Sequence, residues 1–541
     1  MDGDFYGRKD VLALVRRRVA DLKEGYRQNM ALLGSMHVGK SAILRQFMAD
    51  LDDSSVIPVY LDLEGRDIHY FASKFIRSIL YHFARGKGLS PAEALPDLLA
   101  VVERSIPSTA ARAREILSLM EKSRWSEAYD QMLSLPEVFS QETGCYCLII
   151  LDEFQVLDDF GIPDVFQRLA DRITTQKKAL YLVSSSYEEL ARGILAEKLT
   201  LLFGNFEAVM VEPFNALQSR EFIAARMGSV AVGLQLKGFL ADFTGGRPLY
   251  LDMLAHELLN LASIYKQPEI YAPLVTQAVE NMVFSRWGAL SRHFELTIGK
   301  VTAGKANRLV SDIIRSLAEG SNRVKDLADS LGSAKTTAVS QKLNYLVAED
   351  VVEKNGSHFH IKDKLFRYWI KYVFLRRARS LELEAGRLRK EFKEDVARAI
   401  QEFNSTCCQE FSCRVTELLH CFDNDHMNLK GRKYRVPAFK DIRPLEAFQR
   451  GGSSCEILQA DTEEGMWLLV LRKEPLAETD INVVTQELRA RGLKPRRCVI
   501  VSLSDLDDGV RLRALEERMW IWNESELNSL MNIFGKPHIV L

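Results

Sequence analysis

A short run near the N-terminus has the residue types and spacing of a phosphate-binding loop. It matches the pattern G-x-x-x-x-G-K-[ST] at Gly34, Gly39, Lys40 and Ser41. The glycines let the backbone curl so that N–H groups face phosphate oxygens, Lys40 adds a positive charge at the β- and γ-phosphates, and the Ser41 hydroxyl is a Mg²⁺ ligand. The residues expected to surround the phosphates are Gly34, Ser35, Met36, His37, Val38, Gly39, Lys40, Ser41 and Ala42. The run therefore predicts ATP and Mg²⁺ as cofactors, with Lys40 also acting in catalysis.

An acidic pair follows a buried strand further along the chain. The apolar run Tyr146–Leu151 ends in Asp152 and Glu153. We expect Asp152 to hold Mg²⁺ at the end of that strand and Glu153 to act as the catalytic residue that polarises the attacking water. A surface Asp–Glu pair after a core strand is the alternative interpretation. The order of phosphate loop and acidic pair along the chain is the one that an α/β nucleotide-binding sheet requires, which favours the catalytic interpretation.

Short apolar runs alternate with helical patterns through the N-terminal part of the chain. The runs are 30–33, 56–63, 146–151, 179–183 and 208–211. Such alternation predicts an α/β fold in which a parallel sheet is covered on both faces. Residues 64–144, between the second and third runs, exceed a usual crossover and are interpreted as a helical insertion.

The composition places the chain among ordinary soluble globular proteins and excludes several classes. At 541 residues the chain is too long to fold around a single hydrophobic core. Its net charge of −1 gives no overall attraction to nucleic acid or acidic membranes. No apolar run approaches the ~20 residues needed to cross a bilayer, and the acidic start does not resemble a signal peptide. The 8 cysteines are not spaced as a disulfide framework. We expect a cytoplasmic protein with free thiols and no membrane partner.

Several further boxes, taken in order, resemble those of the archaeal-type ATPase family, a branch of the STAND/AAA+ P-loop ATPases. The boxes are Phe5-Tyr6-Gly7-Arg8, Asp152-Glu153-Phe154-Gln155, Glu212-Pro213-Phe214, Thr244–Tyr250 and Ile361–Trp369. The resemblance covers roughly residues 5–375. It implies an AAA+/STAND-type parallel sheet followed by a helical lid and a winged helix.

The resemblance also implies roles for individual residues. Phe5, Gly7 and Arg8 are expected near the nucleotide base, and Ser184 or Ser185 is expected to sense the γ-phosphate. A serine turn that caps the next helix is the alternative for the serines. Arg247 and Pro248 are expected to contact the nucleotide, the alternative being that Arg247 is a surface arginine at a helix start.

One departure from the family pattern concerns the arginine finger. Family members carry Gly-Arg before the fifth strand, whereas this chain has Gly204-Asn205. Because an arginine finger is worth roughly 10³–10⁵ in rate, hydrolysis is expected to be slow or to use another arginine such as Arg192 or Arg247.

Residues 304–360 have the pattern of a winged helix-turn-helix. Helices are expected at 306–318, 324–331 and 335–348, followed by two short strands around Asn355-Gly356. The exposed positions expected on the third helix are Lys335, Thr336, Thr337, Gln341 and Lys342. Duplex DNA is one possible partner of this helix, but the helix offers few cations to bind DNA phosphates. A packing role against the nucleotide domain or a protein partner is the alternative.

The C-terminal part resembles a restriction-endonuclease fold that has lost its metal site. Such a nuclease needs an acid on one strand and Glu-x-Lys on the next. Glu456 and Lys473 are present, but Leu471 stands where the second acid belongs.

A cluster of cysteines and histidines (Cys407, Cys408, Cys413, His420, Cys421 and His426) lacks the paired knuckles of a structural zinc site. We therefore expect its cysteines on one apolar helix as buried thiols.

These inferences divide the chain into four parts and favour one function. The expected parts are 1–215 (the ATPase core, with the 64–144 insertion), 216–300 (the lid), 301–375 (the winged helix) and 376–541 (a helical connector and the nuclease-like α/β domain). The leading hypothesis is an ATP-hydrolysing switch or motor that acts on the two downstream modules, with a protein client or self-assembly as partner. The alternative is a DNA-binding or DNA-processing protein regulated by ATP. An active nuclease is disfavoured by Leu471.

Overall fold

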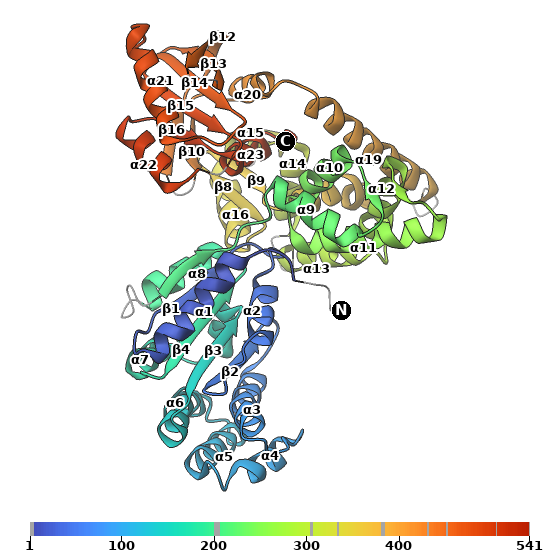
Figure 1. The fold of residues 1–541 in the computed structure, drawn as a ribbon. Coiled ribbons are helices and arrows are strands. Elements are labelled where there is room, and N and C mark those ends of the chain that lie inside the picture. The colour runs from blue at the N-terminus through green and yellow to red at the C-terminus, as the bar shows by residue number, and fades with distance from the viewer. Residues whose placement is uncertain are drawn as a thin grey trace. The chain divides into compact units, whose positions relative to one another are not determined.

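The computed structural model describes residues 5–199, 206–302, 307–332, 335–379, 385–429, 432–450, 453–504 and 506–539. The chain forms two compact units, 1–212 and 213–541, each with its own cores. Figure 1 shows the first unit in blue to teal and the second in green to red. None of the described helices is both long and apolar enough to cross a membrane.

The first unit is built on a fully parallel sheet, as the alternating pattern predicts. Its strands are β1 (Asn29–Leu33), β2 (Val56–Asp62), β3 (Tyr146–Asp152), β4 (Ala179–Ser185) and β5 (Phe206–Met210). They lie in the order β2-β3-β4-β1-β5, with β1 in the interior between β4 and β5. The carboxyl ends of β1, β3 and β4 therefore meet at one edge, which is where ligands bind in such sheets.

Alternate residues of these strands face two different helical layers. Met30, Leu32 and Leu182 pack with α1 (Lys9–Lys23) and α2 (Lys40–Ala49). Ala31, Leu33 and Val183 face the other layer, which contains α3 (Ile68–Gly86), α7 (Val165–Thr175) and the helical insertion. Covering both faces leaves the strands almost wholly apolar, which is why their sequences lack polar alternation.

The insertion after β2 is helical throughout most of its length. Besides α3 it comprises α4 (Leu95–Val102), α5 (Pro107–Glu121) and α6 (Trp125–Thr143). Helix α4 begins at Leu95, with Pro96 in its first turn, where a missing N–H costs nothing. The remaining elements of the unit are η1 (Phe154–Phe160), α8 (Glu188–Gly193) and η2 (Ile194–Lys198).

The second unit begins with a helical subdomain and continues into a helix–hairpin module. The helical part has α9 (Ala216–Met227), α10 (Leu234–Thr244), α11 (Pro248–Tyr265), α12 (Ala272–Val279), η4 (Glu280–Phe284), α13 (Ala289–Thr302) and the short pair β6 (Ala231–Val232) and β7 (Glu269–Ile270). The module has α14 (Asn307–Glu319), α15 (Val324–Ser330), α16 (Thr336–Ala348) and the hairpin β8 (Val352–Asn355) and β9 (His358–Ile361). This is the order of elements of a winged helix.

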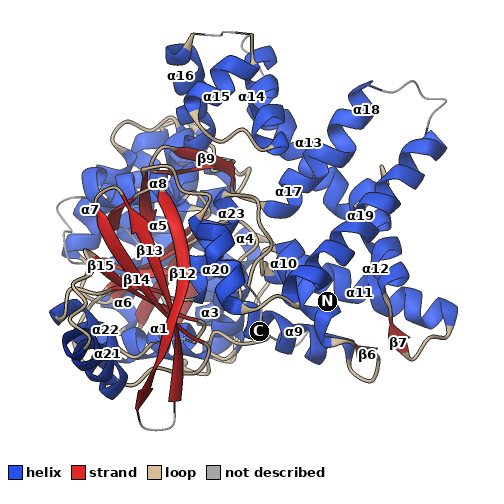
Figure 2. Cartoon of the chain, turned by 90° about the horizontal axis from the view of Figure 1, so that it is seen from above, coloured by secondary structure: helices blue, strands red, loops and turns tan. Residues whose placement is uncertain are grey.

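The last part of the second unit contains a mixed sheet. It is preceded by five helical segments: α17 (Lys364–Trp369), η5 (Ile370–Phe374), α18 (Leu375–Arg379), α19 (Ala385–Cys407) and α20 (Phe411–Leu419). A hairpin and three long strands follow, β10 (Asp425–Leu429), β11 (Arg432–Val436), β12 (Phe439–Arg450), β13 (Ser453–Thr462) and β14 (Gly465–Arg472). The chain then alternates helices and strands through α21 (Glu478–Ala490), β15 (Arg497–Ser502), α22 (Asp508–Glu516), β16 (Trp520–Trp522) and α23 (Glu524–Ile533). Strands β12, β13 and β14 are antiparallel neighbours, whereas β15 and β16 add in parallel. Figure 2 labels β12, β13, β14 and β15 of this sheet.

This part differs from the expectations in two respects. The β10–β11 hairpin, whose first strand alternates buried and exposed residues, was not predicted. The cysteine-rich stretch is not one helix, because α19 ends at Cys407 and α20 starts at Phe411. Cys408 and Cys413 are consequently exposed, and Cys407 and Cys421 are only partly buried.

Candidate nucleotide site

The loop between β1 and α2 is shaped by its two glycines. A Cβ on Gly34 would overlap the carbonyl oxygen of Val211, so the loop passes too close to that backbone for any other residue. Gly39 is left-handed, with φ +98°, at the N-cap of α2, a conformation that favours glycine. The turn thus directs the first N–H groups of α2 into the loop, where they form an anion-binding helix start.

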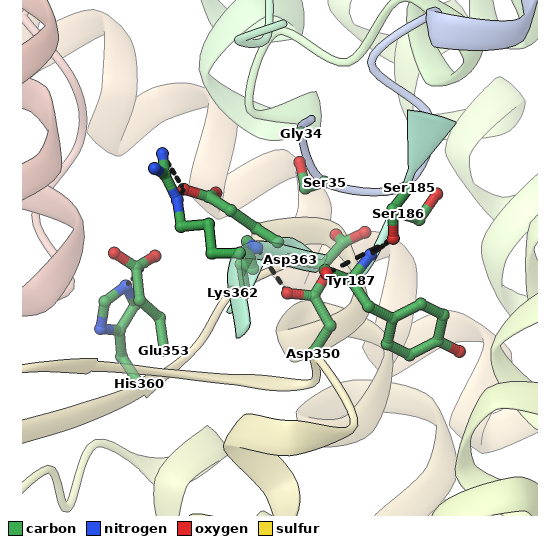
Figure 3. Close-up of polar contacts among 12 residues, drawn as sticks. Gly34, Ser35, Ser185, Ser186, Tyr187, Asp350, Glu353, His360, Lys362 and Asp363 are labelled. Atoms are coloured by element: carbon green, nitrogen blue, oxygen red, sulfur yellow. Dashed lines mark hydrogen bonds and ion pairs between the residues drawn. The ribbon is translucent and has the colours of Figure 1, made fainter. Parts of the chain in front are cut away.

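Lys40 is folded back onto its own loop. It is only 4% exposed, and its Nζ donates to the carbonyls of Gly34 (2.9 Å) and Ser35 (3.1 Å). A third bond from Nζ goes to Ser186 Oγ at 2.9 Å, directly after the end of β4. Figure 3 labels Ser186 beside Ser185, together with Gly34 and Ser35 of the loop. The ammonium is therefore held at the phosphate position by neutral oxygens.

Asp152 is buried at the end of β3, between the ends of two other strands. It lies in register with Asp62 of β2 and Ser184 of β4. Ser184 Oγ donates to Oδ1, and the Tyr60 hydroxyl donates to Oδ2 at 2.8 Å. Burial and the Asp152 charge raise the pKa of Tyr60, which keeps its hydroxyl protonated as a donor. Asp152 is thus oriented by two hydroxyls. In this structure Ser184 contacts the carboxylate.

Glu153 follows immediately in a left-handed conformation, with φ 57° and ψ 50°. Because of this turn, the side chains of Glu153 and Asp152 point in different directions. Its carboxylate accepts bonds from Gln155 Nε2 (2.8 Å), from the backbone N–H of Ser186 (2.9 Å) and from Ser186 Oγ. A non-glycine residue in this conformation costs of order 1 kcal/mol or more, and such strain gathers at functional sites.

The residues present fit a nucleotide and a divalent cation. Gln155 Oε1 is a buried oxygen without a hydrogen-bond partner beside the acidic pair. The Asp152 carboxylate and Ser41 hydroxyl are oxygen donors of the kind that Mg²⁺ prefers. With the loop and Lys40, they provide a complete donor set for a phosphate–Mg²⁺ group.

The N-terminal box joins this site through Arg8. Arg8 is left-handed (φ 56°), directly after Gly7 (φ 70°). Its guanidinium donates to the carbonyl of Glu212 and, at 3.5 Å, to that of Val38 in the phosphate loop. Burial lowers the pKa of Arg8. Phe5 packs, partly buried, on the cluster that contains α1 and α2. The box therefore lies beside the loop, and its assignment to the base remains a prediction.

The arginines considered for sensing differ in their surroundings. Arg247, at the N-cap of α11 with Pro248 following, is 6% exposed, so the surface alternative is wrong. Its Nε lies 3.7 Å from Asp363, and Tyr250 donates to the same carboxylate at 2.6 Å. Arg192 pairs with Glu188 at 3.2 Å on α8. Asn205, at the expected arginine-finger position, lies outside the described residues.

Three residues of the site were not predicted from the sequence as site residues. Ser186 contacts both Lys40 and Glu153, Gln155 donates to Glu153, and Tyr60 donates to Asp152. Ser184 and Ser185 are the last two residues of β4 and Ser186 follows it, whereas sequence analysis selected the first two.

The nuclease-like strands and the cysteine cluster were the other two candidate sites. Glu456 lies directly opposite Leu471 across β13 and β14, and Leu471 is buried in the apolar core. Among the residues that the structure describes, no group of three or more His, Cys, Asp and Glu side chains is arranged to hold a metal ion. The cysteines of known placement are free thiols.

Comparisons with known proteins find a similarity that lies in the first unit. Residues 4–183 match the family model for an AAA ATPase domain. None of the curated proteins compared matches the chain. Among solved structures, the Walker-type ATPase PABY2304 of Pyrococcus abyssi is similar at 16% identity and a TM-score of 0.46, over 68% of this chain and 96% of its own. The Aeropyrum pernix ORC2 protein, in its ADPNP–ADP complexes, is similar at 14% identity and a TM-score of 0.42, over 73% and 95%. These two likenesses are too distant to add to the family match.

Proposed function

Because residues 4–183 match the family model for an AAA ATPase domain, we propose that this chain is an ATP-driven switch of the archaeal-type STAND/AAA+ group, acting in the cytoplasm. Nucleotide state in the first unit would set the conformation of the winged helix and the nuclease-like domain. A protein client or a second copy of the chain would receive the output.

One observation carries the proposal of hydrolysis. Lys40 and the adjacent Asp152 and Glu153, from two separate segments of the first unit, converge at the carboxyl edge of the sheet and contact Ser184 and Ser186 at the end of β4. A site that only bound nucleotide would need the loop and the Mg²⁺ ligand Asp152 but not Glu153.

The chemistry can be assigned residue by residue. Ser41 and Asp152 would hold Mg²⁺, which when bound supplies positive charge to the phosphate oxygens. Lys40 would move from its loop carbonyls to the β- and γ-phosphates. Glu153 would orient the attacking water and accept its proton at a carboxylate oxygen.

A protein-packing role of the winged helix is supported by contacts within the second unit. Asn355 of β8 and Asn428 of β10 exchange two bonds, from Asn355 Nδ2 to the Asn428 carbonyl (2.9 Å) and from the Asn428 N–H to Asn355 Oδ1 (2.5 Å). Asp425 lies 2.8 Å from Arg323 and 2.9 Å from His358. A Cβ on Gly356, at the wing turn, would overlap the His426 carbonyl. The wing, which is the β8–β9 hairpin, therefore packs against the β10–β11 hairpin.

The test of the proposal is ATP turnover by the purified chain. We expect phosphate release that stops when EDTA removes Mg²⁺ and returns when Mg²⁺ is added in excess. We also expect hydrogen exchange in α14–α17 to change when ATP binds. A chain that binds no ATP, or whose second unit exchanges identically with and without it, would contradict the switch.

DNA binding is a second candidate function, favoured by one feature of the module. A cavity of about 380 Å³ beside α16 is lined by Arg323, Lys325 and Lys354 among others. Lys325 and Lys354 would contact backbone phosphates, whereas Arg323 already pairs with Asp425. If DNA binds there, a gel-shift series will show affinity that falls steeply with salt and falls further when Lys325 and Lys354 are changed to Gln. If DNA is not shifted in the gel, or if its shift does not depend on salt, only the packing role of the winged helix is supported.

A further inference from the structure

The cavity beside α16 has three polar walls. The start of α15 supplies Lys325, α16 supplies Ser340 and Asn344, and the wing supplies Lys354 and, at its turn, Ser357. The cavity volume of about 380 Å³ lies in the range of roughly 300–1,000 Å³ that binding sites occupy. The three elements thus bring polar side chains together at one concave surface.

The wing turns a face without carboxylates toward this cavity. In the register of β8 and β9, Lys354 lies opposite Phe359, and Glu353 lies opposite His360. Because successive residues of a strand point to opposite faces, Lys354 and Phe359 share the face that lines the cavity, and Glu353 is on the other face. Among the described residues that line the cavity there is no carboxylate. Its two lysines therefore favour an anionic ligand.

Most of the polar side chains in the cavity are available to that ligand. In the described part of the chain, the side chains of Lys325, Ser340, Asn344 and Ser357 form no hydrogen bond or ion pair. The amide and the two hydroxyls can each donate and accept hydrogen bonds. This mixture suits a peptide backbone, which presents both N–H donors and carbonyl acceptors, whereas the phosphate oxygens of DNA only accept.

A third cation of the cavity wall already binds carboxylates. Arg323 contacts Asp423 at 3.4 Å and Asp425 at 2.8 Å, both from the segment that leads into β10. A duplex would need more cations than the cavity offers, since DNA-binding proteins commonly neutralise about 6–10 phosphates. The other lysines of the α16 segment, Lys335 and Lys342, do not line the cavity. Two lysines are enough, however, for a peptide with a pair of acidic side chains.

We infer that this cavity docks an acidic, extended segment of a partner protein. Carboxylates of the segment bind Lys325 and Lys354, and its backbone bonds to Asn344 and the serines. The inference rests on the proposed function, because the docked segment belongs to the protein client that receives the output of the switch.

The experiment is a fluorescence-anisotropy titration of the full chain with a labelled octamer of glutamate. Lys325→Gln and Lys354→Gln should each weaken binding about 2- to 5-fold, the strength of one exposed ion pair. An octamer of glutamine should therefore bind about 4- to 25-fold more weakly than the glutamate octamer, the product of two such pairs. Lys354→Arg keeps the charge and should bind like the wild type.

The controls are Lys335→Gln and Lys342→Gln, which remove cations outside the cavity and should leave peptide binding unchanged. Melting temperatures check that each variant is folded. A 20-base-pair duplex, added as a competitor, tests the other occupant of this surface.

Each outcome bears on one proposal. Equal binding of the glutamate and glutamine octamers overturns the inference, and so does glutamate binding that survives in both Lys325→Gln and Lys354→Gln. Weakening by Lys335→Gln or Lys342→Gln to the same extent places the peptide outside the cavity. If the duplex binds more tightly than the peptide and loses affinity with the cavity lysines, DNA is the occupant. A chain that binds the peptide but no ATP contradicts the proposed function alone, and a chain that hydrolyses ATP without binding the peptide contradicts this inference alone.

Discussion

Glu153→Gln should lower the rate of ATP hydrolysis by about 10²–10⁴-fold, the range typical for loss of a general base. The amide keeps the size of the side chain and can still accept bonds from Gln155 and Ser186, so the left-handed turn at Glu153 should survive. It cannot accept a proton from water at neutral pH. Phosphate release at saturating ATP measures the effect, and nucleotide binding should persist.

The matched control is Asp159→Asn. Asp159 is an exposed carboxylate in η1, a few residues from Glu153 and outside the polar contacts of the site. Its hydrolysis rate should equal that of the wild type. An unchanged rate in Glu153→Gln would show that another group activates the water.

The phosphate loop and the acidic pair were predictable because their chemistry is local. Gly39 needs a left-handed φ, and Lys40 follows it directly in the chain. The acidic pair also follows its strand without a gap. Ser186, by contrast, meets Lys40 across 146 positions of the sequence. Its hydroxyl is distinguished from those of Ser184 and Ser185 only by the direction of each side chain at the end of β4.

The errors in the second unit have a similar physical origin. Apolar spacing through residues 403–422 is continuous with one helix, but the chain turns between Cys407 and Phe411. The two helices then bury different sides, and the cysteines near the turn become accessible. The hairpin from Asp425 was missed because its exposed positions are polar, and its partner surface on the wing is distant in sequence.

A buried charge cluster in the second unit provides the clearest test of its stability. Asp242 of α10 contacts Lys364 Nζ at 2.5 Å and the backbone N–H of His538 at 2.8 Å. Burial raises the pKa of Asp242, but the charges of Lys364 and His538 outweigh it and leave that pKa lowered. Arg414 of α20 donates to the neighbouring Pro537 carbonyl at 2.6 Å. The cluster therefore joins the helical subdomain, the helix after the wing and the C-terminal segment.

Asp242→Ala should destabilise the second unit by about 3–5 kcal/mol, because it leaves the Lys364 ammonium buried without its partner. Combining it with Lys364→Met should restore most of that free energy, since a buried pair replaced by apolar groups is close to neutral. Asp252→Ala is the control. That carboxylate pairs with Arg226 at 2.7 Å but is 48% exposed, so its loss should cost less than about 1 kcal/mol.

Hydrogen exchange of the α10 and α17 amides in urea measures these free energies within the second unit alone. If Asp242→Ala costs no more than Asp252→Ala, the cluster contributes no more than an exposed ion pair. If the double variant is as unstable as Asp242→Ala, the loss comes from the His538 contact. The C-terminal segment, rather than the Lys364 charge, would then be what Asp242 stabilises.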